Sequence, residues 1–245
     1  MVIGFAGSGN MARALAVGWG EPALFSDGGS GRAGALAALV GGSAVSNSEL
    51  GKRADLLVLA HKPMQLKDVA AEVGSARVVL SLLGATPVSQ IEAAYPGAAV
   101  VRAMPNTAVE VRAGVSCVCG QEVAEVEQLL SRVGVVMRLP ERLMDAATAV
   151  SGVAPAYVAL IAEAWVDAAV AQGIPAAQAA ALVGASLAGA AALLQARGMD
   201  TLAVRREVTS PGGMTARGLR ALEQAGLRSA FANAAVAVAA TQNTK

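Results

Sequence analysis

The sequence predicts an α/β protein in which an N-terminal doubly wound sheet is followed by an all-helical domain. Short apolar runs alternate with helical stretches through roughly the first 145 residues, the pattern of a parallel sheet with crossover helices. After Ser151 no strand pattern recurs, and alanine-rich helical stretches fill the rest of the chain. We therefore expect a first domain over residues 1–148 and a second over residues 149–245.

The expected strands are short and apolar, as in a sheet that is buried on both faces. They cover residues 2–5, 23–25, 55–60, 77–82 and 98–102, with two more near 115–119 and 134–138. In the first domain, helices are expected over 33–40, from Ser46 or Asn47, and over 122–132. In the second, they are expected over 155–171, 175–196, 215–224 and 228–241.

The composition favours a small-molecule partner. Nineteen Lys and Arg stand against 18 Asp and Glu, so the chain lacks the basic surface that nucleic acids or anionic membranes require. Cys117 and Cys119 lie two residues apart in an apolar run. We expect them to be core residues on one face of a strand. We expect no metal site, and the absence of a basic, cleavable leader indicates a cytoplasmic protein.

One uncharged stretch, residues 176–194, is long enough to cross a membrane. It consists mostly of alanine with several glycines and polar residues, so its transfer into lipid would gain little free energy. A helix that packs closely against another helix is the better interpretation. Because the helical domain has so much apolar surface, we predict that helices from two subunits interleave in a homodimer.

The first residues of the chain combine a strand, a glycine turn and a helix start. Gly7 and Gly9 remove the side chains that would keep a diphosphate from the backbone. The helix that begins near Asn10 offers free N–H groups to the anion. Asp27 follows twenty positions after Gly7, at the end of a second apolar run. This spacing predicts a Rossmann-type dinucleotide-binding domain.

The cofactor is either NADH or NADPH. Asp27 would bond the ribose 2′-hydroxyl of NAD, whereas Ser26, Ser30 and Arg32 could receive the 2′-phosphate of NADP. The sequence is compatible with either cofactor.

A second loop, residues 208–215, interrupts the helical half of the chain. Thr209 and Ser210 supply hydroxyls, and Gly212 and Gly213 clear the backbone. Thr215 stands where the next helix begins, so several N–H donors converge on one spot. The loop is either a carboxylate site or an ordinary helix-start turn.

Five motifs in order resemble those of the pyrroline-5-carboxylate reductase family over nearly the whole chain. They are Gly-Phe-Ala-Gly-Ser-Gly-Asn-Met-Ala at 4–12, Asp55 with Lys62-Pro63, Arg-Ala-Met-Pro-Asn-Thr at 102–107, Ser-Gly-Val-Ala-Pro-Ala-Tyr at 151–157, and Thr-Ser-Pro-Gly-Gly-Met-Thr at 209–215.

The resemblance implies roles for individual residues. The cofactor phosphates are expected on the glycine loop, at Gly7, Ser8, Gly9, Asn10 and Met11. Asn47 matches a residue that meets the adenosine ribose, and Ala60, Lys62 and the turn from Met104 through Asn106 to Thr107 line the nicotinamide side. The substrate carboxylate is expected at Ser210, Gly212, Gly213, Met214 and Thr215. The family's helical domain dimerises, often into larger rings.

Departures from the family pattern fall near the substrate. Val153 and Ala154 replace a serine and a glycine, Ala108 replaces a proline, Ala185-Ser186 replaces a Gln-Thr pair, and Met214 replaces a small residue. These differences bear on the identity of the substrate more than on the type of reaction.

The distribution of basic residues favours reduction of C=N over C=O. Reducing a ketone creates an alkoxide that an acid must protonate, usually Lys, His or Tyr. Between Ser151 and Thr244 there is no Lys or His. A protonated cyclic imine needs no such acid. Thr215 is the candidate hydroxyl for the ring nitrogen or carboxylate, and Lys62 either holds the cofactor, orients the substrate or is solvated.

The expected activity is therefore reduction of 1-pyrroline-5-carboxylate, a small cyclic imino acid, to L-proline, the last step of proline biosynthesis. Two alternatives are a reductase of a related cyclic imine or keto acid, and a non-catalytic dinucleotide-binding protein.

Overall fold

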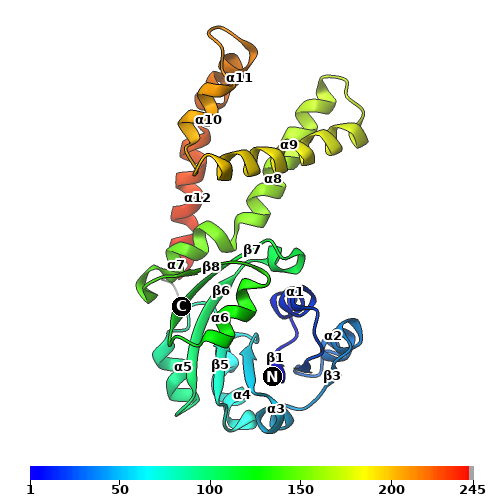
Figure 1. Ribbon diagram of the computed structural model, residues 1–245, viewed down its shortest axis with the longest axis vertical. Coiled ribbons are helices and arrows are strands. Elements are labelled where there is room, and N and C mark those ends of the chain that lie inside the picture. Colours follow the sequence, from blue (N-terminus) through cyan, green and yellow to red (C-terminus); the bar gives the residue numbers. More distant parts are fainter. Residues whose placement is uncertain (243–245) are drawn as a thin grey trace. The chain divides into compact units, whose positions relative to one another are not determined.

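The computed structural model describes residues 1–242 (Figure 1). The chain divides into two compact units, Met1–Pro155 and a second that begins at Ala156. The division thus falls inside the Ser-Gly-Val-Ala-Pro-Ala-Tyr stretch, a few residues beyond the expected boundary at Thr148.

The first unit is built on an eight-stranded sheet with the order β3-β2-β1-β4-β5-β6-β7-β8. The strands are β1 Ile3–Ala6, β2 Leu24–Ser26, β3 Ser43–Ala44, β4 Leu56–Leu59, β5 Val78–Ser81, β6 Ala99–Pro105, β7 Gly114–Gly120 and β8 Gly134–Arg138. The order reverses between β1 and β4, which are neighbours. In such sheets ligands bind outside the carboxyl ends of the strands at this switch point.

All strand pairs are parallel except β6 with β7. A parallel pair needs a crossover of about a dozen residues or more. Between β6 and β7 there is only a short segment that contains the 3₁₀ helix η2, Thr107–Val111, so β7 must run back beside β6.

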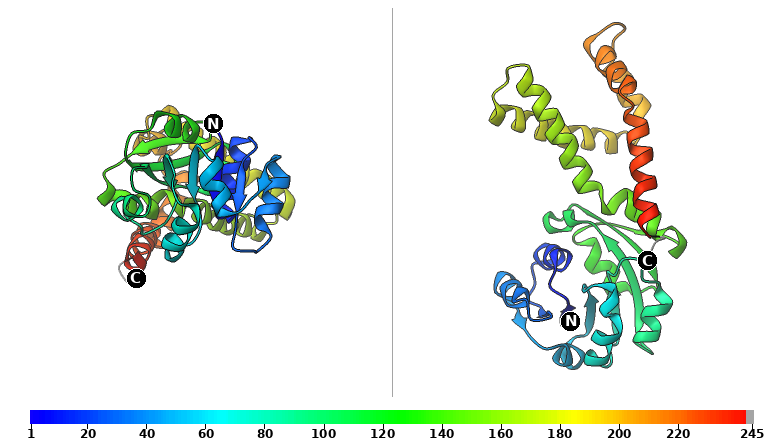
Figure 2. Two further views of the ribbon diagram at one scale, coloured as in Figure 1. Left: turned by 90° about the horizontal axis from the view of Figure 1, so that it is seen from below. Right: turned by 180° about the vertical axis from the view of Figure 1, so that it is seen from behind.

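Helices cover both faces of the sheet (Figures 1 and 2). On one face, the buried core includes residues of α1 Asn10–Trp19, α2 Arg32–Val40 and α6 Ala124–Ser131. On the other, it includes residues of α3 Asn47–Arg53, α4 Leu66–Val73 and α5 Val88–Ala94. Along β4 the side chains alternate, with Leu56 and Val58 in the first core and Leu57 and Leu59 in the second. The predicted doubly wound sheet is confirmed.

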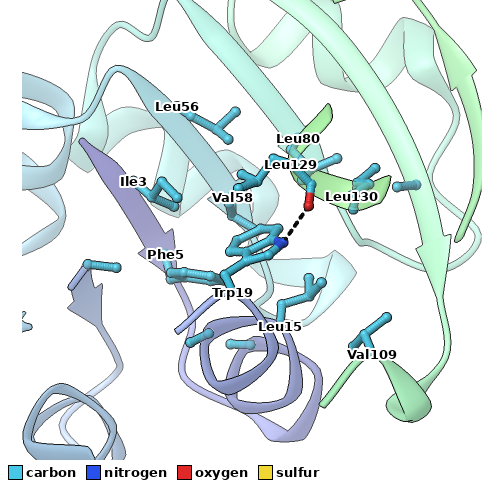
Figure 3. Close-up of a cluster of buried hydrophobic side chains, with 14 of the residues drawn as sticks. Ile3, Phe5, Leu15, Trp19, Leu56, Val58, Leu80, Val109, Leu129 and Leu130 are labelled. Carbon is cyan, nitrogen blue, oxygen red and sulfur yellow. Dashed lines mark hydrogen bonds between the residues drawn. The ribbon is translucent and has the colours of Figure 1, made fainter. Parts of the chain in front are cut away.

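The first core fixes α1 against the sheet (Figure 3). Phe5 of β1 stacks on Phe25 of β2, with ring centroids 5.1 Å apart, and lies 5.7 Å from the ring of Trp19. The buried Trp19 Nε1–H donates to the carbonyl oxygen of Leu129 at 2.9 Å. Burying rings of this size holds the helix firmly, so its N-terminus stays at the end of β1.

A chain of short helices leads out of the sheet after β8. It contains η3 Glu141–Leu143, α7 Met144–Ala147 and a π-helix, Thr148–Gly152. The guanidinium of Arg102, buried on β6, holds this segment by ion pairs to Glu141 and Asp145. Cys117 and Cys119 pack against Met144 from one face of β7, as their spacing predicts.

The second unit is helical throughout its described residues. Its helices are α8 Ala154–Ala171, whose first two residues still belong to the first unit, α9 Ala176–Ala196, α10 Thr201–Glu207, α11 Met214–Gln224 and α12 Leu227–Gln242. Only α10 was not expected. Its start is marked by Asp200, whose carboxylate accepts from the backbone N–H groups of Leu202 and Ala203. Tyr157 packs edge-on against Phe231, with ring centroids 6.4 Å apart.

The helices of the second unit leave much apolar surface uncovered. In the described chain no residue of α8 is buried, and only Ala179 and Val183 of α9 are. Leu160 is 66% exposed. Two helical stretches, Glu141–Ala171 and Ala176–Ala196, are long and apolar enough to cross a membrane by length and composition alone. Surface of this kind marks a region that associates with another apolar surface.

Candidate active site

The turn after β1 has a backbone that only glycine can adopt without strain. Gly7 has a φ of +103°, and a Cβ there would lie 2.5 Å from the backbone nitrogen of His61. Its N–H donates to the carbonyl oxygen of Ser26 at 3.1 Å, and the hydroxyl of Ser8 donates to the same oxygen at 3.0 Å. The turn is therefore fixed between the ends of β1, β2 and β4.

Gly9 leaves the start of α1 open. It is the N-cap of that helix, and no side chain caps the first turn in the described structure. A Cβ on Gly9 would meet no described atom within 4 Å. The unpaired N–H groups and the positive end of the helix dipole thus face free space, which is the arrangement that binds a phosphate group.

A cavity of about 880 Å³ opens in front of this turn. It lies at the carboxyl ends of β1, β2 and β4, where the strand order reverses. Every predicted cofactor residue outside the turn from Met104 through Asn106 to Thr107 lines it: Gly7, Ser8, Gly9, Asn10, Met11, Ser26, Asp27, Arg32, Asn47, Ala60 and Lys62. Its size and its glycine cradle fit an extended dinucleotide.

The loop after β2 is organised by Asp27. One carboxylate oxygen accepts from the N–H of Gly29 at 2.8 Å, and the other accepts from the hydroxyl of Ser30 at 2.9 Å and the N–H of Ala33 at 2.8 Å. The hydrogen bond from Ala33 is the main reason that the pKa of Asp27 lies below its usual value. Both oxygens are therefore used within the loop.

Arg32 lies in the same loop with its charge unpaired among the described residues. Its Nε–H donates to the hydroxyl of Ser30 at 3.2 Å, which leaves the terminal nitrogens of the guanidinium without a described partner. Both side chains line the cavity. An exposed guanidinium beside a hydroxyl suits a phosphate.

The end of β4 forms another wall through Ala60, His61 and Lys62. Nδ1 of His61 lies 2.9 Å from the carbonyl oxygen of Lys62, which can only accept, so Nδ1 carries the proton in this contact. Burial lowers the pKa of His61. The side chain of Lys62 is exposed, lines the cavity and has no ion pair among the described residues.

Two predicted residues at the end of β6 serve the fold. Nδ2 of Asn106 donates to the carbonyl oxygen of Ser151 at 3.0 Å, and its Oδ1 accepts from the N–H of Val115 at 3.3 Å. The amide thus ties β6 to β7 and to the π-helix, and a cofactor contact at Asn106 stays a prediction. Met104 packs against the cluster of Cys117 and Met144, and a substrate contact at Met104 stays a prediction.

The predicted substrate loop lies in the second unit, and α11 begins there much as α1 does. Gly213 is the N-cap, in an extended conformation, and no side chain caps the first turn in the described structure. Gly212 has a φ of +67°, and the N–H of Gly213 donates to the carbonyl oxygen of Ser210 at 3.1 Å. Thr215 is half-buried in the first turn, and Met214 is 83% exposed. The free N–H groups suit a carboxylate.

Several residues that line the cavity were not predicted from the sequence. They are Gly28, His61, Gln65, Asp68, Val69 and Glu72, with Ser30 expected only as a phosphate contact. Gln65, Asp68, Val69 and Glu72 recur at the spacing of one helical face along η1 and α4, and that periodicity was their only signal.

Comparisons with known proteins cover both units. The family described as pyrroline-5-carboxylate reductase dimerisation matches residues 141–245, and the family described as NADP oxidoreductase coenzyme F420-dependent matches residues 2–85. The pyrroline-5-carboxylate reductase of Synechocystis sp. is 39% identical over 197 residues, which cover 77% of this chain and 74% of that protein.

Two solved structures extend the likeness over the full fold. A pyrroline-5-carboxylate reductase from Coxiella burnetii is 30% identical, with a TM-score of 0.85 over 98% of this chain and 97% of its own. The Plasmodium falciparum pyrroline carboxylate reductase with NADP bound is 25% identical, with a TM-score of 0.85 over 99% of this chain and 97% of its own.

Proposed function

This chain belongs to the pyrroline-5-carboxylate reductase family, and we propose that it uses NAD(P)H to reduce the C=N bond of 1-pyrroline-5-carboxylate to L-proline. The observation that carries the proposal is the glycine cradle. Gly7 cannot bear a side chain, Gly9 opens the start of α1, and the cavity in front of them has room for a dinucleotide.

The bound cofactor supplies the hydride. The chain's own task is to hold the cofactor and to keep the reacting carbon dry and close. The first turn of α1 binds the diphosphate through Asn10 and Met11, whose N–H groups no side chain caps in the described structure. Ala60 and Lys62, at the end of β4, form the wall toward the nicotinamide side.

The cofactor is held as NADPH in this proposal. Arg32 and Ser30 are the 2′-phosphate ligands, because the guanidinium has no ion pair in the described chain and the hydroxyl lies beside it. Both carboxylate oxygens of Asp27 accept hydrogen bonds within the loop, from Gly29, Ser30 and Ala33. Asp27 therefore acts mainly by fixing the conformation of this loop.

The substrate carboxylate binds at the start of α11. Gly213 leaves the first N–H groups of that helix without a side-chain cap among the described residues, and the hydroxyl of Thr215 stands in the same turn. The imine takes its proton from water before hydride transfer. The resulting iminium is already electrophilic, and hydride addition to it gives a neutral amine, so no side-chain acid is needed. This agrees with the absence of Lys and His between Ser151 and Thr244.

The second unit belongs to a dimerisation domain, and the partner is a second copy of the chain. The matched range, residues 141–245, contains both apolar helical stretches, including the exposed Leu160. Pairing of two such surfaces would remove them from water without any lipid. A homodimer, able to assemble into larger rings in the cytoplasm, is the expected form.

The test is a cofactor-oxidation assay. Purified protein should oxidise NADPH when 1-pyrroline-5-carboxylate is added, with L-proline as the product identified by chromatography. Turnover of a bulkier cyclic imine in place of this one would favour the alternative reductase, and cofactor binding without turnover of any imine would favour a non-catalytic protein.

A further inference from the structure

Glu72 closes a line of hydrogen bonds along one wall of the cofactor cavity. The hydroxyl of Ser26, at the end of β2, donates to Oδ1 of Asn47, and Nδ2 of Asn47 donates to Oε2 of Glu72 at 2.7 Å. All three residues line the cavity. This line fixes the orientation of the Asn47 amide and holds the Glu72 side chain, on α4, in a defined position.

The line lies at the adenosine end of the cavity. Ser26 immediately precedes Asp27, and in this fold the end of β2 meets the adenosine ribose. Asn47 begins α3, which follows β3, the strand next to β2. Glu72 is joined to β2 through Asn47, so it also borders the adenosine half and not the nicotinamide half.

The carboxylate of Glu72 is exposed in the cavity, and a cofactor bound there would cover it, so the carboxylate then needs a hydrogen-bond donor from that cofactor. Glu72 has no cation within ion-pair distance among the described residues, and Oε1 has no described hydrogen-bond partner. An unpaired carboxylate next to a polyanionic cofactor is unfavourable unless it accepts a hydrogen bond from it. The adenosine half offers two kinds of donor, the ribose hydroxyls and the exocyclic amine of adenine. Asn47 stands between Glu72 and the end of β2, where the ribose is expected, so the amine is the donor left for Glu72.

We propose that Glu72 is a specificity-determining residue that recognises adenine: Oε2 fixes Asn47 and Oε1 accepts the exocyclic amine. The inference rests on the dinucleotide cofactor of the proposed function, and it does not depend on the imine substrate. Its probe is the cofactor analogue with hypoxanthine in place of adenine, which presents a carbonyl oxygen where adenine has the amine.

Calorimetric titration of the full-length protein with oxidised NADP and with its hypoxanthine analogue tests the inference. The wild type should bind the adenine form about tenfold more tightly or better, the usual value of a hydrogen bond to a charged group. In Glu72→Gln, the amide oxygen still accepts from Asn47, but the amide nitrogen now faces the base and donates. The preference for adenine should fall to near parity.

Asp68→Asn is the matched control, because Asp68 is a carboxylate one helical turn away that lines the same cavity. Loss of a charge alone should change the affinity of both cofactors together and leave their ratio as in the wild type. An unchanged ratio in Glu72→Gln, parity in the wild type, or an equal loss of preference in Asp68→Asn would overturn the assignment. Intact selectivity without imine turnover would refute only the proposed function.

Discussion

Gly7 and His61 approach so closely that a Cβ on Gly7 would lie 2.5 Å from the backbone nitrogen of His61. Contacts this short do not occur for real Cβ atoms, and the neighbour is backbone that cannot rotate away. The junction of β1 and β4 therefore leaves no room for a side chain where the cofactor is expected to cross.

Gly7→Ala should destabilise the protein and abolish cofactor binding. The positive φ of Gly7 and the contact with His61 together should lower the free energy of unfolding by about 2–4 kcal/mol. Gly9→Ala is the matched variant, since its Cβ points into the open cavity. It should unfold at the same urea concentration as the wild type yet bind NADP poorly. Equal stability of the two variants would count against this reading of the turn.

Arg32→Ala should separate the two cofactors. If the guanidinium holds the 2′-phosphate, the KM for NADPH should rise about tenfold or more, while the KM for NADH stays within twofold. Arg77→Ala is the control, because Arg77 is exposed just before β5, at the opposite end of the strands. An equal rise in KM for NADPH and NADH would mean that Arg32 contacts a part of the cofactor that both forms share.

His61 should make stability depend on pH near neutrality. Burial lowers its pKa from 6.5, so the unfolded chain takes up a proton more readily than the folded protein does. Stability should be full above pH 6.5 and decline as the pH falls through the folded-state value. His61 is the only histidine. Melting of the cofactor-free protein at pH 7.5 and 5.5 should show a smaller loss in His61→Gln, and identical losses would exclude this cause.

Thr215→Val should weaken substrate binding because it removes a hydroxyl and keeps the shape. We expect the KM for 1-pyrroline-5-carboxylate to rise about tenfold and the KM for NADPH to stay the same. Thr215→Ser keeps the hydroxyl and should restore most of the affinity. If the valine and serine variants behave alike, the hydroxyl has no role in holding the substrate.

Much of the fold and of the dinucleotide site could be predicted from local sequence patterns. The strands β1 and β4 are continuous apolar runs, and the glycine turn is specific because it stands between a strand and a helix with Asp27 twenty positions after Gly7. The β3 strand was missed because Ser43 and Ala44 are both exposed and form no apolar run. The antiparallel direction of β7 follows from the short connection between β6 and β7. It was not predicted, because the sequence located the ends of these strands only approximately.

The residues missed in the site have a physical reason in common. Asp68 and Glu72 look like ordinary solvated charges on an amphipathic helix, and only the packing of α4 beside β4 brings them to the cavity. The same limit applies to Asn106, whose position in a family motif gave no sign that its amide bonds to Ser151 and Val115. A motif identifies a residue, but the residues that it contacts from distant parts of the chain are known only from the folded structure.

Incubation of the wild-type protein with NADPH and 1-pyrroline-5-carboxylate, with both NADPH absorbance and L-proline formation followed over time, is the decisive test of the proposed reduction. We expect stoichiometric loss of NADPH and gain of L-proline, with much slower turnover in Gly9→Ala and in Thr215→Val. Protein that binds NADPH and is folded and dimeric, yet forms no proline with either cofactor, would contradict it.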